Sequence, residues 1–134
     1  MVKMIIDASN GIFGRLCGFA AKKALEGNEI IIVNSENAII TGNKKNIIEK
    51  YQILRKKGGT SLKGPKYSKI PYMMLKRGIR GMLPNHRRGQ GKLAFSRIRC
   101  YSKIPTEFEG QKMIKAGHSK PKKFITLKEL SEKL

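Results

Sequence analysis

Acidic residues are scarce in this sequence and missing from its middle. The 134 residues include 9 Asp and Glu against 29 Lys and Arg, which gives a formal net charge of +20. No acid occurs between Glu49 and Glu107, so that segment offers no pair of carboxylates for acid–base catalysis. A charge of this size attracts polyanions, and we expect a nucleic acid or, less favoured, an anionic membrane surface as the partner.

Cysteine and histidine are also rare. Cys17 and Cys100 lie far apart and form no C-x-x-C pair, which argues against a zinc knuckle and a disulfide framework. We expect two reduced thiols that pack as small apolar residues. His86 and His118 have no second candidate ligand close in the sequence, so no metal site and no metal cofactor are predicted.

Long hydrophobic runs are absent. The longest aliphatic run, 30–33, falls far short of the ~20 residues that span a membrane, and the first residues lack the apolar segment and cleavage site of a signal peptide. The hydrophobic content of 40% suffices for a core at this length. We therefore expect a soluble intracellular protein with one domain, residues 1–134.

The positive charge is unevenly distributed. Residues 1–49 carry a net charge of +1, whereas residues 50–124 carry +19. This segregation is typical of a scaffold that presents one face or extension to a polyanion. Lysine, arginine and glycine are concentrated in two loops, at about 57–71 and 84–92, and in a C-terminal stretch at about 110–124. We expect these three segments to bind the polyanion.

The first third of the chain has the pattern of an α/β scaffold. Short apolar segments at 4–7, 29–34 and 38–41 predict strands, because β-branched residues dominate them. Apolar residues spaced three and four apart predict helices over 12–25 and 46–57. The order strand, helix, strand, strand, helix indicates a sheet with at least one parallel crossover.

A further helix, over 72–83, has an apolar side and a basic side. Lys76, Arg77 and Arg80 share the basic side, and we expect the two glycines, Gly78 and Gly81, to permit close approach of another backbone. Pro84 ends this helix. Its apolar side, predicted to pack on the core, comprises Tyr72, Leu75, Ile79, Met82 and Leu83.

The last third of the chain, from residue 92, predicts only short elements. Residues 92–96 predict a short helix, and 97–101 predict a strand with Ile98 on one face and Arg97, Arg99 and Tyr101 on the other. Residues 112–124 have the composition of a basic loop. The final helix starts at a capping box, in which Thr126 is the N-cap.

Three kinds of function remain open at this point. The segment 7–14 lies between a strand and a helix, as phosphate-binding loops do, but it has neither G-x-G-x-x-G nor a P-loop pattern, so a nucleotide-binding enzyme is weakly supported. A sequence-specific DNA regulator normally concentrates its charge on one recognition helix. Here the charge is spread over 50–124, which favours a folded RNA recognised by shape and phosphate.

The segment GMLPNHRRGQGKLAFSRIRCY, residues 81–101, resembles the thirteenth large-subunit ribosomal protein family in its shorter archaeal and eukaryotic form. The likeness runs through nearly the whole chain in order. Its other matching residues are Asp7, Gly14-Arg15-Leu16, Ile32-Val33-Asn34, Ile40-Thr41-Gly42-Asn43-Lys44, Pro105 and Ile125-Thr126-Leu127 through Leu130.

Two features are similar to the archaeal and eukaryotic form in particular. Gly27-Asn28 leads directly into the strand at 29–32, without the insertion of bacterial members, and Lys63-Gly64-Pro65-Lys66-Tyr67 replaces their histidine- and glycine-rich loop. Asn85-His86 stands where lysine or tryptophan is more usual in the family.

The resemblance implies an α/β fold with three layers, α/β/α, around a small, mostly parallel sheet of about four strands. It also implies a structural constituent of the large ribosomal subunit that binds large-subunit ribosomal RNA, lies beside other large-subunit proteins and supports assembly. No catalytic residue, cofactor or small-molecule substrate is implied. We expect Tyr67 to stack on a base and the following residues to contact RNA: Lys56, Lys57, Lys63, Lys66, Lys69, Arg77, Arg80, His86, Arg87, Arg88, Lys92, Lys120, Lys122 and Lys123.

Overall fold

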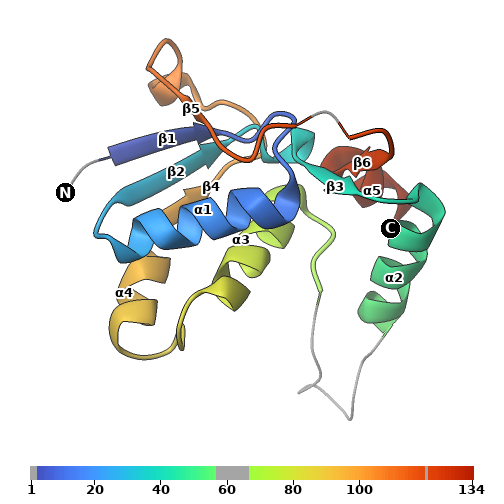
Figure 1. Ribbon diagram of the computed structural model, residues 1–134, viewed down its shortest axis with the longest axis horizontal. Coiled ribbons are helices and arrows are strands. Elements are labelled where there is room, and N and C mark those ends of the chain that lie inside the picture. Colours follow the sequence, from blue (N-terminus) through green and yellow to red (C-terminus); the bar gives the residue numbers. More distant parts are fainter. Residues whose placement is uncertain (1–2, 57–66, 120) are drawn as a thin grey trace.

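A four-stranded parallel sheet lies at the centre of the protein (Figure 1). The computed structural model describes residues 3–56, 67–119 and 121–134. The strand order is β4-β2-β1-β5, with every neighbouring pair parallel. Its two longer strands, β1 (Lys3–Asp7) and β2 (Glu29–Val33), pair along their full length, and β4 (Ile98–Cys100) and β5 (Ile114–Lys115) form the edges.

Three helices cover one face of this sheet. Helix α1 (Phe13–Leu25) connects β1 to β2, and its small side chains let the sheet and the next helices approach closely. Helices α3 (Pro71–Met82) and α4 (Gly89–Ser96) pack on the same side, where Leu75 and Ile79 are fully buried. Cys17 is buried between α1 and α3, and its thiol donates to the carbonyl of Leu75 at 3.6 Å.

The apolar side of α3 differs in part from the prediction. Leu75, Ile79 and Leu83 are buried as expected, but Tyr72 is 37% exposed and Met82 is 47% exposed, so placing those two in the core was wrong. Met74, which the helical pattern did not assign, is buried instead. The reason is that α3 crosses α1 with a narrower strip of its surface, which leaves side chains at the margins of the contact in solvent.

The opposite face of the sheet is covered more thinly. Ile5, Ile31 and Val33 form a second buried cluster with Phe108, which lies at the end of a short 3-10 helix, η3 (Thr106–Phe108). The prediction of an α/β fold with about four mostly parallel strands is confirmed. In the described residues, the third layer consists of η3 and the segments around it, not of an α-helix.

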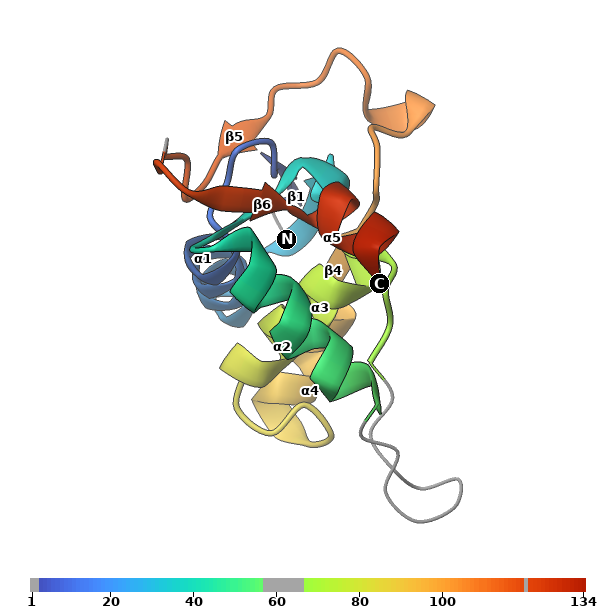
Figure 2. The ribbon, with the colours of Figure 1, turned by 90° about the vertical axis from the view of Figure 1, so that its right-hand side faces the viewer.

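A smaller unit stands at the carboxyl ends of the strands (Figure 2). Strand β3 (Ile39–Thr41), which follows the 3-10 helix η1 (Ser35–Asn37), pairs antiparallel with β6 (Phe124–Thr126). Helix α2 (Lys44–Lys56) follows β3, and α5 (Leu127–Lys133) follows β6. Thr126 caps α5 as predicted, since its hydroxyl accepts from the Glu129 N–H at 3.1 Å.

The C-terminal basic stretch is more regular than predicted. We expected a loop over 112–124, but β5 and the start of β6 lie within it. Both strands are only two or three residues long, so they have no periodicity that a sequence pattern could reveal. Backbone pairing with β1 and β3, which are distant in sequence, orders them.

Asp7 ties the ends of β1 and β2 together. One of its carboxylate oxygens accepts from the Ser9 N–H at 3.0 Å and from the Asn34 side-chain amide at 3.1 Å. Partial burial by itself would raise the pKa of Asp7, but these hydrogen bonds and the charge of Lys115 outweigh it and hold the pKa below its usual value. Asn34 adopts a left-handed backbone with φ of 57°, which asparagine tolerates better than most residues.

Replacing Asp7 with Asn should therefore destabilise the protein in a pH-dependent way. A lowered folded-state pKa stabilises the fold above the ordinary aspartate pKa, and that stabilisation is lost as the pH falls through the folded-state pKa. We expect the variant to lose about 1 kcal/mol of unfolding free energy near pH 7 and little near pH 2, measured by urea denaturation. An equal loss at both pH values would contradict this explanation.

Candidate nucleic-acid interface

The basic side of α3 is held in place by stacking contacts. The guanidinium of Arg77 lies 4.0 Å from the centre of the Tyr67 ring, and the Lys76 ammonium lies 5.1 Å from the centre of the Phe95 ring. Both cations are half-buried, so their aliphatic stems cover apolar surface while their charged ends stay accessible. Such contacts position the charges before any ligand arrives.

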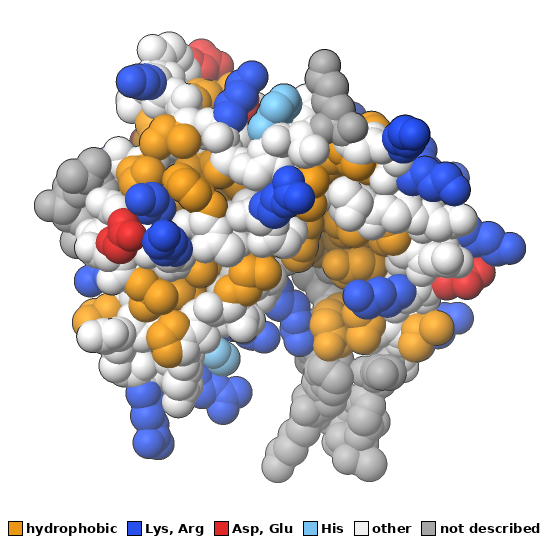
Figure 3. Space-filling model, viewed as in Figure 1, with side chains coloured by type: hydrophobic (Ala, Val, Ile, Leu, Met, Phe, Trp, Pro, Cys, Tyr) orange, Lys and Arg blue, Asp and Glu red, His pale blue; other side chains and the backbone are white. Residues whose placement is uncertain are grey.

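A groove of about 430 Å³, which we call the α3 groove, opens beside these residues. Helices α1, α2, α3 and α4 and the segment before α3 contribute its walls. Figure 3 shows a hollow with Lys and Arg side chains at its floor. Among the described residues that line it, none is acidic. Its lining includes four aromatic side chains, Phe13, Tyr51, Tyr67 and Phe95, and four cations, Lys50, Lys76, Arg77 and Arg80.

Gly78 shapes one wall of the α3 groove. A Cβ atom at this position would lie 2.7 Å from Cζ of Phe13 and 3.0 Å from Sγ of Cys17. The glycine thus permits close approach of side chains from α1, not of another backbone as predicted. At Gly81 a Cβ atom would meet nothing within 4 Å, so no close approach explains that glycine among the described residues.

The loop between α3 and α4 is a fixed turn. The side-chain oxygen of Asn85 accepts from the Arg87 N–H at 3.1 Å, and the Asn85 carbonyl accepts from the Arg88 N–H at 3.3 Å. Leu83 anchors the start of the loop in the core. Arg87 and Arg88 are consequently exposed on an ordered backbone.

Helix α4 begins earlier than predicted, at Gly89 instead of Lys92. The basic loop is therefore shorter than 84–92, and Lys92 is exposed on the first turns of the helix. The cause is a close backbone contact: Gly91 packs directly against the carbonyl groups of Pro84 and Asn85. This contact folds the loop back on α4 and has no signature in the hydrophobic pattern.

His86 contacts helix α4. Its ring meets Phe95 edge-on, with 6.1 Å between ring centres. Its pKa is lowered from the ordinary 6.5, first by partial removal of the ring from water and then by the charges of Arg80 and Arg87. The lowered pKa favours the neutral ring in the free protein, so His86 offers the interface a ring and hydrogen-bonding nitrogens.

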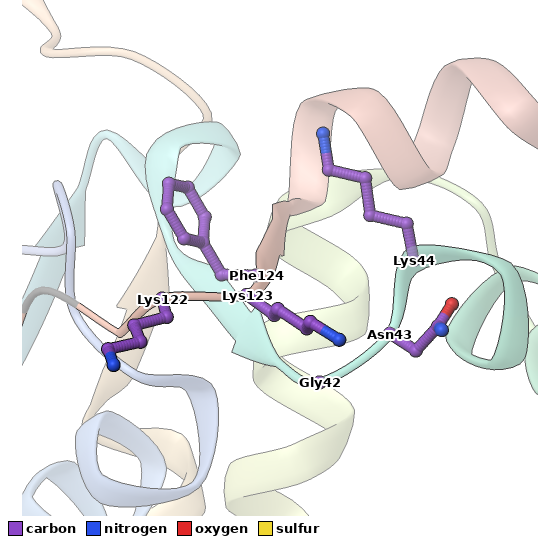
Figure 4. A pocket seen from close by; sticks show the side chains of 6 residues that line it. All are labelled: Gly42, Asn43, Lys44, Lys122, Lys123 and Phe124. Carbon is purple, nitrogen blue, oxygen red and sulfur yellow. The ribbon is translucent and has the colours of Figure 1, made fainter.

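Lys122 and Lys123 lie at a separate pocket, shown in Figure 4. We call it the β3–β6 pocket; it measures about 430 Å³, and its lining is Gly42, Asn43, Lys44, Lys122, Lys123 and Phe124. Lys123 extends toward Gly42 and Asn43, whereas Lys122 points away from them. Lys44 pairs with Glu129 across the pocket rim at 3.2 Å.

The structure thus groups only some of the predicted RNA-binding residues. The α3 groove is lined by Tyr67, Arg77 and Arg80, and His86 adjoins it through Phe95. The same surface continues over Arg87, Arg88 and Lys92. Lys122 and Lys123 belong to the β3–β6 pocket. Lys56, at the end of α2, and Lys69, before α3, are exposed and line neither the α3 groove nor the β3–β6 pocket. Four predicted residues lie outside the described part of the chain: Lys57, Lys63, Lys66 and Lys120.

Sequence reasoning missed several residues of this surface. Lys76 was placed on the basic side of the helix, since Arg80 follows it four residues later, but it was not among the residues expected to contact RNA. Lys50, Tyr51 and Phe95 reach the groove from other helices, and only the tertiary structure shows this. Arg55 was also missed: it donates to the carbonyls of Tyr67 and Leu134, both at 3.3 Å, and so fixes the segment that carries the Tyr67 ring.

Residues 2–107 match the family described as ribosomal protein L13. The chain is 44% identical over 133 residues to the large ribosomal subunit protein uL13 of Thermoplasma acidophilum, covering 97% of this chain and 96% of that protein. It is 41% identical over 133 residues, with the same coverage, to the protein of that name from Methanocaldococcus jannaschii. These matches show that the chain belongs to the ribosomal protein L13 family.

Proposed function

We propose that the protein is a structural constituent of the large ribosomal subunit and binds large-subunit ribosomal RNA mainly through one surface. That surface comprises the basic side of α3, the α3–α4 loop and the α3 groove, with the β3–β6 pocket as a second contact. The observation that carries the proposal is the gathering of aromatic rings and cations around α3, in a part of the chain without any carboxylate between Glu49 and Glu107. Related proteins carry the name of a large-subunit protein.

The geometry supports binding by neutralisation of phosphates. The buried strip of α3 fixes the helix on the core, so Arg80 and its neighbours are displayed on a rigid support. Each phosphate that a cation neutralises releases counterions, which makes the affinity fall steeply with salt. Cations already positioned by Tyr67 and Phe95 lose less side-chain entropy on binding.

The alternative of a nucleotide-binding enzyme has no support. In such folds the phosphates lie against the loop that follows the first strand. Here the segment 116–118 occupies that place: the Ile12 N–H donates to the Gly117 carbonyl at 3.1 Å, and a Cβ at Gly11 would lie 3.0 Å from the Ala116 carbonyl oxygen. The family role is structural, and the protein is not an enzyme.

The proposed location is the cytoplasmic ribosome, beside other large-subunit proteins. In the described residues, no helix has the length and apolar character needed to cross a membrane. The exposed residues of η3 and α5 lie outside the α3 groove, and we propose that they face protein neighbours.

Sedimentation of a lysate from the source cells tests this proposal. We expect the protein to migrate with large subunits at moderate salt and to leave them only when high salt displaces phosphate contacts. The control is the same gradient after ribonuclease treatment, which should release the protein. A pool that sediments only as a free protein, with none on large subunits, would refute the proposal.

A further inference from the structure

We infer that the α3 groove holds one unpaired base of the RNA, with the neighbouring phosphates on the cations of its rim. This inference rests on the proposed RNA binding and makes it more specific. The ligand class is a single-stranded or bulged nucleotide, in contrast to the duplex backbone that the exposed Arg87 and Arg88 can contact.

The size and lining of the groove match such a nucleotide. Its volume of about 430 Å³ lies within the range of sites for small organic ligands. Aromatic side chains come from three helices and from the segment before α3, so a planar group that enters has aromatic residues on several sides. Stacking of bases on such rings tolerates any base, because every base has a π-face.

The charges select a nucleotide over an apolar protein side chain. Lys50, Lys76, Arg77 and Arg80 line the groove together with the rings, and none of its described lining residues is acidic. An apolar side chain from a protein neighbour would satisfy the rings but would remove these cations from water without a counter-charge. An unpaired nucleotide satisfies both, since its base stacks while its phosphates meet the cations.

Two structural details keep the groove open. Without a side chain at Gly78, the Phe13 ring can lie against α3 instead of projecting into the groove. Arg55 holds the backbone at Tyr67, and the Arg77 guanidinium covers one part of the Tyr67 ring. Arginine planes stack on bases as aromatic rings do, so the Arg77–Tyr67 pair extends the platform that a base would meet.

Three RNA probes separate this inference from RNA binding in general. The first is an RNA duplex with one bulged 2-aminopurine nucleotide, the second carries an abasic residue in place of that bulged base, and the third is the same duplex without a bulge, which offers phosphates alone. We expect the protein to quench the 2-aminopurine fluorescence and to bind the first probe at least about fivefold more tightly than the second. Binding of the duplex should persist.

Matched variants of α3 locate the effect. Gly78→Ala should push the Phe13 ring toward the groove and abolish both the quenching and the preference for the base. Gly81→Ala, on the same helix with nothing within 4 Å, should leave both unchanged. Phe95→Leu, which removes a ring but keeps an apolar side chain, should also lose the preference; circular dichroism confirms that each variant is folded.

Each outcome bears on one of the two proposals. Equal affinity for the first two probes without quenching, while the duplex still binds, would overturn the nucleotide pocket and leave the proposed function intact. Quenching that survives in both Gly78→Ala and Phe95→Leu would also overturn it, because the base would then bind elsewhere. Failure to bind any of the three RNAs would contradict the proposed function itself.

Discussion

Replacing Arg77, Arg80, Arg87 and Arg88 together with glutamine should weaken binding to large-subunit ribosomal RNA by roughly a hundredfold at about 0.2 M salt. Four lost phosphate contacts should also make the plot of log affinity against log salt shallower by about 3. Both effects arise because these cations share the surface formed by α3 and the α3–α4 loop. Filter binding over a salt series measures them.

The control removes the same charge from elsewhere. A second quadruple variant loses four exposed lysines outside this surface, and it should keep most of the affinity and nearly the full salt slope. If both variants lose affinity equally, only the net charge matters and the proposed surface is wrong. The control positions, each changed to glutamine, are Lys3, Lys22, Lys128 and Lys133.

Gly91→Ala should be among the most destabilising single substitutions in the chain, at about 3 kcal/mol of unfolding free energy. An added Cβ would collide with the Pro84 carbonyl oxygen and would lie 2.5 Å from that of Asn85. Both obstacles are backbone atoms, so no side chain can rotate away, and the α3–α4 loop must move. Urea denaturation followed by circular dichroism measures the change.

Gly81→Ala is the matched control for this prediction. Its Cβ would meet nothing within 4 Å, and it lies inside α3, so alanine should leave stability unchanged or raise it by up to about 1 kcal/mol. The Gly91 variant should also lose RNA affinity, because the displaced loop carries Arg87 and Arg88. Similar stabilities for the two variants would show that the contact at Gly91 does not hold the loop.

Secondary-structure elements with a strong internal pattern could be predicted from the sequence. Helix α1 has apolar residues spaced three and four apart, and β2 is an almost unbroken run of β-branched residues, so both were predicted. The capping box at Thr126 marks the start of α5. The pattern failed where a neighbour decides the outcome. Met82 has the period of a core residue, yet it is 47% exposed because α3 contacts α1 with a narrower strip.

Of the candidate site, mainly the basic residues could be predicted from the sequence. The absence of acids between Glu49 and Glu107 identified the basic surface, and helical spacing placed Lys76 beside Arg80. The α3 groove was not predictable, because Phe13, Tyr51 and Phe95 come from three helices distant in sequence. Only the packing of α1, α2, α3 and α4 brings these rings together with the cations.

Ultraviolet cross-linking of the protein to large-subunit ribosomal RNA, followed by mass spectrometry of the linked peptides, tests the central claim most directly. We predict that the strongest cross-links lie on peptides from the segment 67–95, with Tyr67 and Phe95 among the linked residues, because their rings line the α3 groove. Weaker cross-links should occur near Phe124 in the β3–β6 pocket. Cross-links confined to α1 and η3, with none on 67–95, would contradict the proposed surface.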